Sequence, residues 1–276
     1  IFAGSVFEAE GQYHIFYTGY NRDYPALGKP SQVLMHAYSD DLVTWHKTQD
    51  ALTFTPQEGY DPDDWRDPWV IRDEENDQYL LILGARLQGP KTRQTGRTVK
   101  FTSKDLKNWK KTQILTLKDS WECPDLRRIP VEGGGEKWVF WSADGYYFLG
   151  EFDGYEFKTD GVKLEAYRTK IPYAAQTFWG TEDVITIPWL RTKNKGKLYT
   201  GVMGIPRKLI LAETPEGLRL RQNPVEEFRK ARVSVSVSQG EGKVFYMMQK
   251  AGVVEITVHM QSPCDFVVNL YGTSIT

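Results

Sequence analysis

The sequence predicts an all-β protein in which about four repeated units of a β-propeller are followed by the start of a separate β-sandwich. Two observations carry this prediction. Short apolar segments typical of strands recur at a nearly constant spacing, and a second motif recurs in phase with them. Repeated antiparallel units with little helix favour a propeller, because its radial closure leaves few exposed sheet edges.

The recurring apolar segments predict the same strand in each unit. They cover residues 13–19, 79–84, 138–142 and 198–204, so their starts are 66, 59 and 60 residues apart. Their apolar character is almost continuous, whereas a half-exposed strand would alternate. We therefore expect these strands to be covered on both faces.

The second repeated motif is a polar turn that follows the strand. Residues 39–45 read Ser-Asp-Asp-Leu-Val-Thr-Trp, and residues 103–109, which begin 64 residues later, read Ser-Lys-Asp-Leu-Lys-Asn-Trp. We interpret Ser and Asp as forming the turn, and Leu and Trp as attaching it to its blade. Chance similarity between two surface turns is the alternative, and the regular spacing of the strands argues against it.

The repeats also predict the domain organisation. Four units account for residues 1–232, with a final turn and short helix expected over 217–228. Beyond them, residues 233–238 and 253–258 alternate apolar and polar side chains, as half-exposed strands do. We therefore expect residues 233–276 to be the start of a C-terminal β-sandwich that ends before two sheets are complete.

Composition excludes several classes of partner. The chain has 35 basic and 36 acidic side chains, a net charge of −1, so it offers no cationic surface to nucleic acid or an anionic membrane. It has no apolar run of the ~18 residues that a membrane-spanning helix needs. Two cysteines, Cys123 and Cys264, and four scattered histidines lack the spacing of a disulfide framework or zinc site, so we expect neither metal nor cofactor. The sequence starts at Ile1 without a signal-peptide pattern, so localisation stays open, as does the oligomeric state.

An acidic segment precedes the second unit's first strand. Residues 60–69 read Tyr-Asp-Pro-Asp-Asp-Trp-Arg-Asp-Pro-Trp. A calcium loop is excluded, because the mid-loop Gly is missing and Arg72 stands where the bidentate Glu is needed. A solvated acidic turn would explain the first three acids but not the Trp-Arg-Asp-Pro-Trp run. Arg66 favours the ionised form of Asp67, and we interpret Asp67, between two indoles, as a carboxylate that binds adjacent sugar hydroxyls.

A second segment, residues 121–126, reads Trp-Glu-Cys-Pro-Asp-Leu. Glu122 lies in apolar surroundings, where partial desolvation suits a general acid. The alternative is a structural Glu bonded to Arg127 or Arg128. Because Asp67 and Glu122 are 55 residues apart, about one repeat, we expect them at equivalent places on adjacent blades, converging on the propeller axis. Two carboxylates there favour a glycosidase.

These motifs resemble those of glycoside hydrolase family 32, the invertases, levanases and inulinases. Residues 2–5 resemble the family's Phe-Ser-Gly-Ser motif, 66–68 its Arg-Asp-Pro motif and 122–124 its Glu-Cys-Pro motif. Residues 173–178, 206–209 and 222–225 follow in the family's order, so the resemblance covers nearly the whole chain. It implies a five-bladed β-propeller joined to a C-terminal β-sandwich, with about four blades in this chain.

The resemblance also implies a reaction, the retaining hydrolysis of β-fructofuranosidic bonds in sucrose or a fructan. Glu122 would be the acid/base, and Asp67 would bind two fructose hydroxyls and stabilise the transition state. Four residues would bind substrate in the fructose pocket: Phe2, Ser5, Arg66 and Trp189. For Trp189, a buried core position is the alternative.

Two departures from the family pattern matter. The family's nucleophile is an Asp in a Trp-Met-Asn-Asp-Pro-Asn-Gly type motif on the first blade, and the 276 residues contain no such motif. Since Asp67 matches the stabiliser, we expect the nucleophile and the first blade upstream, and the segment alone to be inactive. In addition, Ala3 stands where the family usually has Ser, which leaves the choice among sucrose, inulin and levan open.

Two other functions remain open at this point. A related propeller glycosidase acting on arabinan or arabinosides would also use three carboxylates, but would not be expected to carry Glu-Cys-Pro. A non-catalytic carbohydrate-binding propeller would keep an aromatic funnel and lack a carboxylate. Motifs also do not decide exo or endo attack, or water or a sugar as acceptor, because loops set pocket depth.

Overall fold

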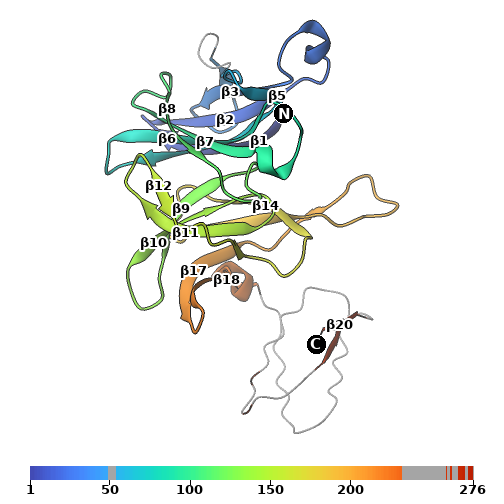
Figure 1. Cartoon of the computed structure of the whole chain (residues 1–276). Coiled ribbons are helices and arrows are strands. Elements are labelled where there is room, and N and C mark those ends of the chain that lie inside the picture. Colours follow the sequence, from blue (N-terminus) through green and yellow to red (C-terminus); the bar gives the residue numbers. More distant parts are fainter. Residues whose placement is uncertain (49–53, 232–258, 260–261, 263–266, 271–272, 276) are drawn as a thin grey trace. The chain divides into compact units, whose positions relative to one another are not determined.

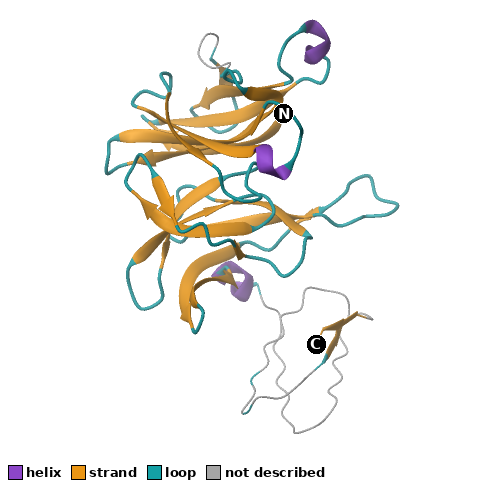
Figure 2. Ribbon diagram, in the orientation of Figure 1, coloured by secondary structure: helices purple, strands orange, loops and turns teal. Residues whose placement is uncertain are grey.

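A computed structural model describes residues 1–48, 54–231, 259, 262, 267–270 and 273–275 (Figure 1). The chain divides into two compact units, Ile1–Ala231 and Arg232–Thr276. Strands dominate the described residues of the first unit, as Figure 2 shows, and its one α-helix, α1 (Glu226–Lys230), follows the last strand. The all-β prediction is confirmed.

The first unit consists of four antiparallel sheets that follow one another along the chain. Blade one is β1 (Phe2–Ala9), β2 (Gln12–Tyr20), β3 (Gln32–Ser39) and β4 (His46–Lys47), and blade two is β5 (Tyr60–Asp73), β6 (Gln78–Leu87), β7 (Gly96–Ser103) and β8 (Lys110–Leu115). Short 3-10 turns, η1 (Tyr24–Leu27) and η2 (Arg93–Thr95), lie between the second and third strands of these blades.

Blades three and four repeat this order with one added strand each. Blade three is β9 (Asp125–Pro130), β10 (Glu136–Trp141), β11 (Tyr146–Phe152) and β12 (Phe157–Thr159), with β13 (Leu164–Glu165) on β11. Blade four is β14 (Pro172–Thr177), β15 (Ile185–Leu190), β17 (Arg207–Thr214) and β18 (Gly217–Pro224), with β16 (Val202–Met203) on β15. Four consecutive up-and-down sheets confirm the propeller of about four blades.

The repeat predicted from apolar segments is correct for three blades and wrong for the fourth. Residues 13, 79 and 138 lie in β2, β6 and β10, the second strands of their blades. Residues 198–204 instead belong to the hairpin between β15 and β17, where only Val202 and Met203 form a short strand and Leu198 is fully exposed. The second strand of blade four is β15. It contains Pro188, and a proline weakens the sequence pattern of a strand.

The repeated polar turn is confirmed. Asp41 Oδ1 accepts hydrogen bonds from the amides of residues 43 and 44 at 2.8 and 2.7 Å, and Asp105 Oδ1 accepts from residues 107 and 108 at 2.9 and 2.8 Å. Asp153 forms the same turn in blade three, without the Ser, Leu and Trp that marked the others. The attaching Leu is buried in blade two (Leu106) but half-exposed in blade one (Leu42), so this part of the interpretation holds only for blade two.

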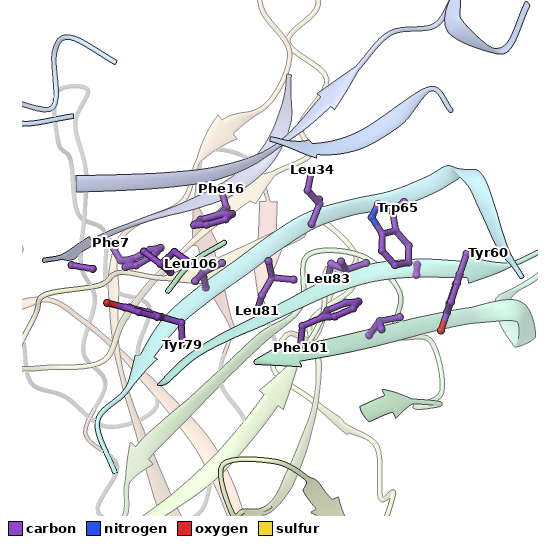
Figure 3. Packing of buried hydrophobic residues seen from close by; sticks show 14 residues of the cluster. Phe7, Phe16, Leu34, Tyr60, Trp65, Tyr79, Leu81, Leu83, Phe101 and Leu106 are labelled. Carbon is purple, nitrogen blue, oxygen red and sulfur yellow. The ribbon is translucent and has the colours of Figure 1, made fainter. Parts of the chain in front are cut away.

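The core lies between the blades. Leu81 and Leu83 of β6 and Phe101 of β7 face blade one and pack with its Phe7 and Phe16 (Figure 3). The alternate residues of β6, Leu80 and Ile82, pack against blade three. This two-sided burial explains the continuous apolar pattern. Each such side chain contributes about 1.5–3 kcal/mol, and the packing fixes the first strands of adjacent blades relative to each other.

Two predictions concern the C-terminal part of the chain. Residues 217–224 form strand β18 where a turn was expected, while the short helix is present as α1. In the second unit the structure describes only the hairpin β19 (Val268–Leu270) and β20 (Thr273–Ile275) in addition to isolated residues. Residues 233–238 and 253–258 lie outside the described residues, so the sandwich and its boundary stay predictions.

Candidate active site

In three of the four blades, the first strand carries candidate residues at a shift of register. The register of β1 shifts between Phe2 and Gly4, that of β5 between Arg66 and Trp69, and that of β14 between Tyr173 and Gln176. In blade three the corresponding residues 122–124 lie directly ahead of β9. A bulge of this kind turns a side chain away from the direction that regular alternation would give it.

Three residues at these irregularities have left-handed backbone although none is glycine. They are Asp67, Cys123 and Ala174, with φ of 57°, 44° and 49°. Such conformations cost of order 1–3 kcal/mol and persist only where neighbouring bonds hold them. Here the amide of Asp67 donates to Thr18 Oγ1 at 2.9 Å, and the amide of Ala174 donates to the Ala143 carbonyl at 2.8 Å. The same strain thus recurs at the start of three adjacent blades, which makes these positions candidates for a functional site.

The residues that precede these three positions meet one another. Arg66 Nη2 donates to Glu122 Oε1 at 2.6 Å, and the Tyr173 hydroxyl donates to Glu122 Oε2. Both carboxylate oxygens of Glu122 are thus held by side chains from the neighbouring blades. The Glu122 side chain is still 26% exposed, so it remains accessible from solvent. The arginine that binds Glu122 is Arg66 and not Arg127 or Arg128, which the structural alternative named; Arg128 bonds to Glu75 at 2.6 Å.

Asp67 lies beside this group and is 4% exposed. Its Oδ2 accepts from the amide and the thiol of Cys123 at 3.1 and 3.5 Å, and lies 3.7 Å from Arg66 Nε. Burial raises the pKa of Asp67 to about 6, although Arg66 and the Cys123 amide lower it. The expectation that Arg66 keeps this carboxylate fully ionised is therefore incomplete, because desolvation outweighs the neighbouring charge.

Arg66 joins the two carboxylates. Its guanidinium contacts Asp67 and Glu122 and also pairs with Asp64. Burial alone would lower the pKa of Arg66, but Asp64, Glu122 and Asp67 together raise it above its usual value. Arg66 therefore stays charged and brings the equivalent places of blades two and three together, as the repeat spacing predicted.

The acidic segment of residues 60–69 differs from its sequence interpretation in two ways. It does not precede the strand but forms most of β5, and the burial of Asp61 and Asp64 also excludes the alternative of a solvated turn. Its two indoles do not flank a sugar site either. Trp65 and Trp69 are buried in the cores on opposite sides of blade two, and Trp65 Nε1 donates to the Phe54 carbonyl.

The other predicted pocket residues lie in different environments. Phe2 is 41% exposed and stacks on Tyr20 with ring centres 4.5 Å apart. The hydroxyl of Ser5 donates to the Pro68 carbonyl at 3.1 Å and accepts from the Val70 amide at 2.9 Å. Ser5 therefore joins blade one to the backbone that follows Asp67.

Trp189 is not a core residue, contrary to the structural alternative. It is 37% exposed on β15 and packs edge-on against Tyr173, with ring centres 6.3 Å apart. Trp189 therefore contacts Tyr173, the residue that donates to Glu122.

Two residues of the site were missed as individual candidates. Tyr173 was part of a matched segment only, because the bulge that it precedes is visible in the structure and not in the sequence. Thr18 is fully buried, donates to the Ala3 carbonyl at 3.2 Å and accepts from Asp67, and no sequence motif marks it. Among the described residues, no group of three or more potential metal ligands is present, and no helix is long and apolar enough to cross a membrane.

Residues 1–224 match the profile of the Glycosyl hydrolases family 32 N-terminal domain. The chain belongs to glycosyl hydrolase family 32. Similar curated family 32 relatives include a levanase of Bacillus sp. (strain L7), 31% identical over 258 residues, and a levanase of Bacillus subtilis (strain 168), 28% identical over 276 residues. These alignments cover 81% and 84% of this chain, but only 26% and 38% of the two levanases.

Solved structures agree on the family 32 fold. Fructan 1-exohydrolase IIa from Cichorium intybus, in complex with 1-kestose, matches with a TM-score of 0.68 at 23% identity, over 84% of this chain and 48% of that one. Exo-inulinase from Aspergillus awamori matches with a TM-score of 0.65 at 22% identity, over 81% and 52%. This chain thus spans about half the length of these two solved proteins and a smaller share of the length of the two levanases.

Proposed function

We propose that this chain forms part of a retaining glycoside hydrolase that cleaves β-fructofuranosidic bonds in sucrose or a fructan. One observation carries the proposal: a single guanidinium, Arg66, holds Asp67 and Glu122 together from adjacent blades. Membership of family 32 supports the reaction class, and the relatives named levanase, invertase and exo-inulinase support the substrate class.

Glu122 acts as the acid/base. In the first step its carboxyl protonates the leaving glycosidic oxygen, and in the second it accepts a proton from the attacking water. The partial exposure of Glu122 supports this role, because the proton must reach a substrate atom. Tyr173 and Arg66 orient the two carboxyl oxygens, so that proton transfer needs no rotamer search.

Asp67 acts as the stabiliser of the transition state. Its buried carboxylate is fixed by Cys123 and accepts hydrogen bonds from sugar hydroxyls, while its negative charge favours the oxocarbenium-like sugar. Because burial raises the pKa of Asp67 to about 6, the free site loses this charge as the pH falls through that value. Catalytic efficiency is then expected to fall on the acid side of about pH 6.

A retaining mechanism also needs a nucleophile, whose carboxyl lies roughly 5–5.5 Å from that of the acid/base. The family resemblance assigns it to an Asn-Asp-Pro motif that the 276 residues do not contain. We therefore propose that the 276-residue chain alone does not turn over substrate. A polypeptide that holds this chain together with such a motif does.

The test is a substrate screen with that longer polypeptide. Sucrose, inulin, levan and arabinan are each incubated with the wild type and with Glu122→Gln, and sugar release is followed by chromatography. We expect fructose or fructo-oligosaccharides from at least one fructoside, and about 10²–10⁴-fold less with Glu122→Gln. Turnover of arabinan alone would favour an arabinan-acting enzyme. Binding of sugars without turnover would favour a carbohydrate-binding propeller, and either result would refute the proposal.

A further inference from the structure

A second ion pair lies behind Arg66. Asp64 stands two residues before Arg66 on β5, and its Oδ1 accepts from Arg66 Nη1. The other oxygen, Oδ2, accepts from Arg86 Nε of β6 at 2.5 Å. The side chains of Asp64, Arg66 and Arg86 are 9%, 14% and 8% exposed. One buried carboxylate is therefore shared by two buried guanidiniums.

Arg86 is itself fixed next to the acid/base segment. Its guanidinium donates to the Thr92 carbonyl and lies over the ring of Trp121 at 5.1 Å, and Trp121 immediately precedes Glu122. Two glycines allow Trp121 to lie close to β6 and β7. A side-chain carbon on Gly84 would collide with the Trp121 carbonyl, and one on Gly96 would lie 2.8 Å from Trp121 Cβ. Arg86 thus contacts both Asp64 and the segment that carries Glu122.

The charges of this cluster do not cancel. Two guanidiniums, Arg66 and Arg86, face three carboxylates, those of Asp64, Asp67 and Glu122, so the fully ionised cluster carries one surplus negative charge. Because most of these groups are buried, solvent screens the surplus weakly. Other titratable groups also face the cluster or its nearest partners: Cys123, Tyr173, Asp144 and Arg93. In the part of the chain that the structure describes, none of them forms a hydrogen bond or ion pair with Asp64.

We propose that Asp64 and Arg86 are positioning residues that fix Arg66 and, through their opposite charges, set how strongly Arg66 binds the carboxylates of Asp67 and Glu122. Asp64 draws Arg66 away from these two carboxylates, and Arg86 offsets that pull by supplying Asp64 with a second cation. The catalytic relevance of Asp64 and Arg86 rests on the proposed function, but the titration that tests their effect on Asp67 does not.

The test is a titration of the Asp67 carboxyl by ¹³C NMR in the 276-residue chain labelled at aspartate. Asp67→Asn identifies the signal by its disappearance. Asp64→Asn removes a negative charge, so the titration midpoint of Asp67 is expected to fall by about one pH unit. Arg86→Gln removes a positive charge, so the midpoint is expected to rise by a similar amount. Arg86→Lys keeps the charge and serves as the matched control, with little expected change.

The double variant Asp64→Asn/Arg86→Gln removes both charges, and its midpoint is expected to lie between those of the single variants, close to the wild type. Thermal melts show whether each variant is folded. If one single variant fails to fold, the direction of the midpoint shift in the other still tests the proposal. Shifts of the same sign from the two single variants, or no shift from either, would overturn the proposal.

The titration does not depend on turnover, so failure of the proposed function would leave its result intact. In a polypeptide that is active, the acid limb of the pH profile of kcat/KM is expected to move in the same two directions. A purely structural role would lower kcat/KM at every pH and leave the limb in place, which would also contradict the proposal.

Discussion

Replacing Thr18 by Val tests how the strained backbone at Asp67 is held. The substitution preserves shape and removes one hydroxyl, which donates to the Ala3 carbonyl at 3.2 Å and accepts from the Asp67 amide at 2.9 Å. Thr18 is fully buried, so no water can replace these bonds without rearrangement. The variant leaves the amide of a residue with φ of 57° without its partner.

The expected cost follows from those two bonds. Each lost hydrogen bond is worth about 1 kcal/mol, and an unsatisfied buried amide adds to this, so the free energy of unfolding is expected to fall by about 2–3 kcal/mol. Urea unfolding followed by tryptophan fluorescence measures the change, with an unchanged slope showing that only stability differs.

Thr98→Val is the matched control for Thr18→Val. Thr98 is equally buried on β7, but its hydroxyl makes one long bond, to the Ser120 carbonyl at 3.4 Å. Its loss is expected to cost about 1 kcal/mol or less. A cost for Thr18→Val no larger than that of Thr98→Val would refute the reasoning that Thr18 holds the Asp67 backbone.

Three further predictions concern the site and its surroundings. Tyr173→Phe removes a charge-assisted bond to Glu122, and kcat is expected to fall about tenfold with KM little changed, as steady-state kinetics would show. Trp189→Ala is expected to raise KM while leaving the melting temperature almost unchanged, because the indole is partly exposed. Burial, His14 and Lys107 lower the pKa of His36 to about 4, so His36 stays neutral in the folded chain. Its contribution to stability is complete above the unfolded value of 6.5 and is lost as the pH falls towards 4, about 2 kcal/mol between about pH 7.5 and pH 5. Urea midpoints should show this loss in the wild type, and His36→Gln should show less of it.

Much of the fold could be predicted because burial on both faces leaves a direct mark in sequence. The continuous apolar pattern of β6 and β10 comes from blades packed on either side, whereas β2 contributes Phe16 to the cluster shared with blade two only. The hairpin around Leu198 is apolar too, yet its side chains are exposed, and composition does not distinguish the two cases.

Less of the site than of the fold could be predicted from the sequence. In a regular strand Trp65, Asp67 and Trp69 would share one face, since they are two residues apart. The left-handed backbone at Asp67 breaks that alternation, so the carboxylate meets Cys123 while the two indoles enter separate cores. Sequence could locate Asp67 and Glu122 by spacing. It could not show a left-handed non-glycine residue, or that Tyr173 from the next blade completes the pair.

If Asp67 and Glu122 act as one catalytic unit on a fructoside, the effects of replacing them depend on each other. In a double-mutant cycle, kcat/KM for sucrose or levan is measured for the wild type, Asp67→Asn, Glu122→Gln and the double variant, in a polypeptide that holds this chain together with an Asn-Asp-Pro motif. We predict that each single variant loses about 10²–10⁴-fold and that the double variant loses little more than the worse single one. Substantial turnover by either folded single variant, or losses that simply multiply, would contradict the claim.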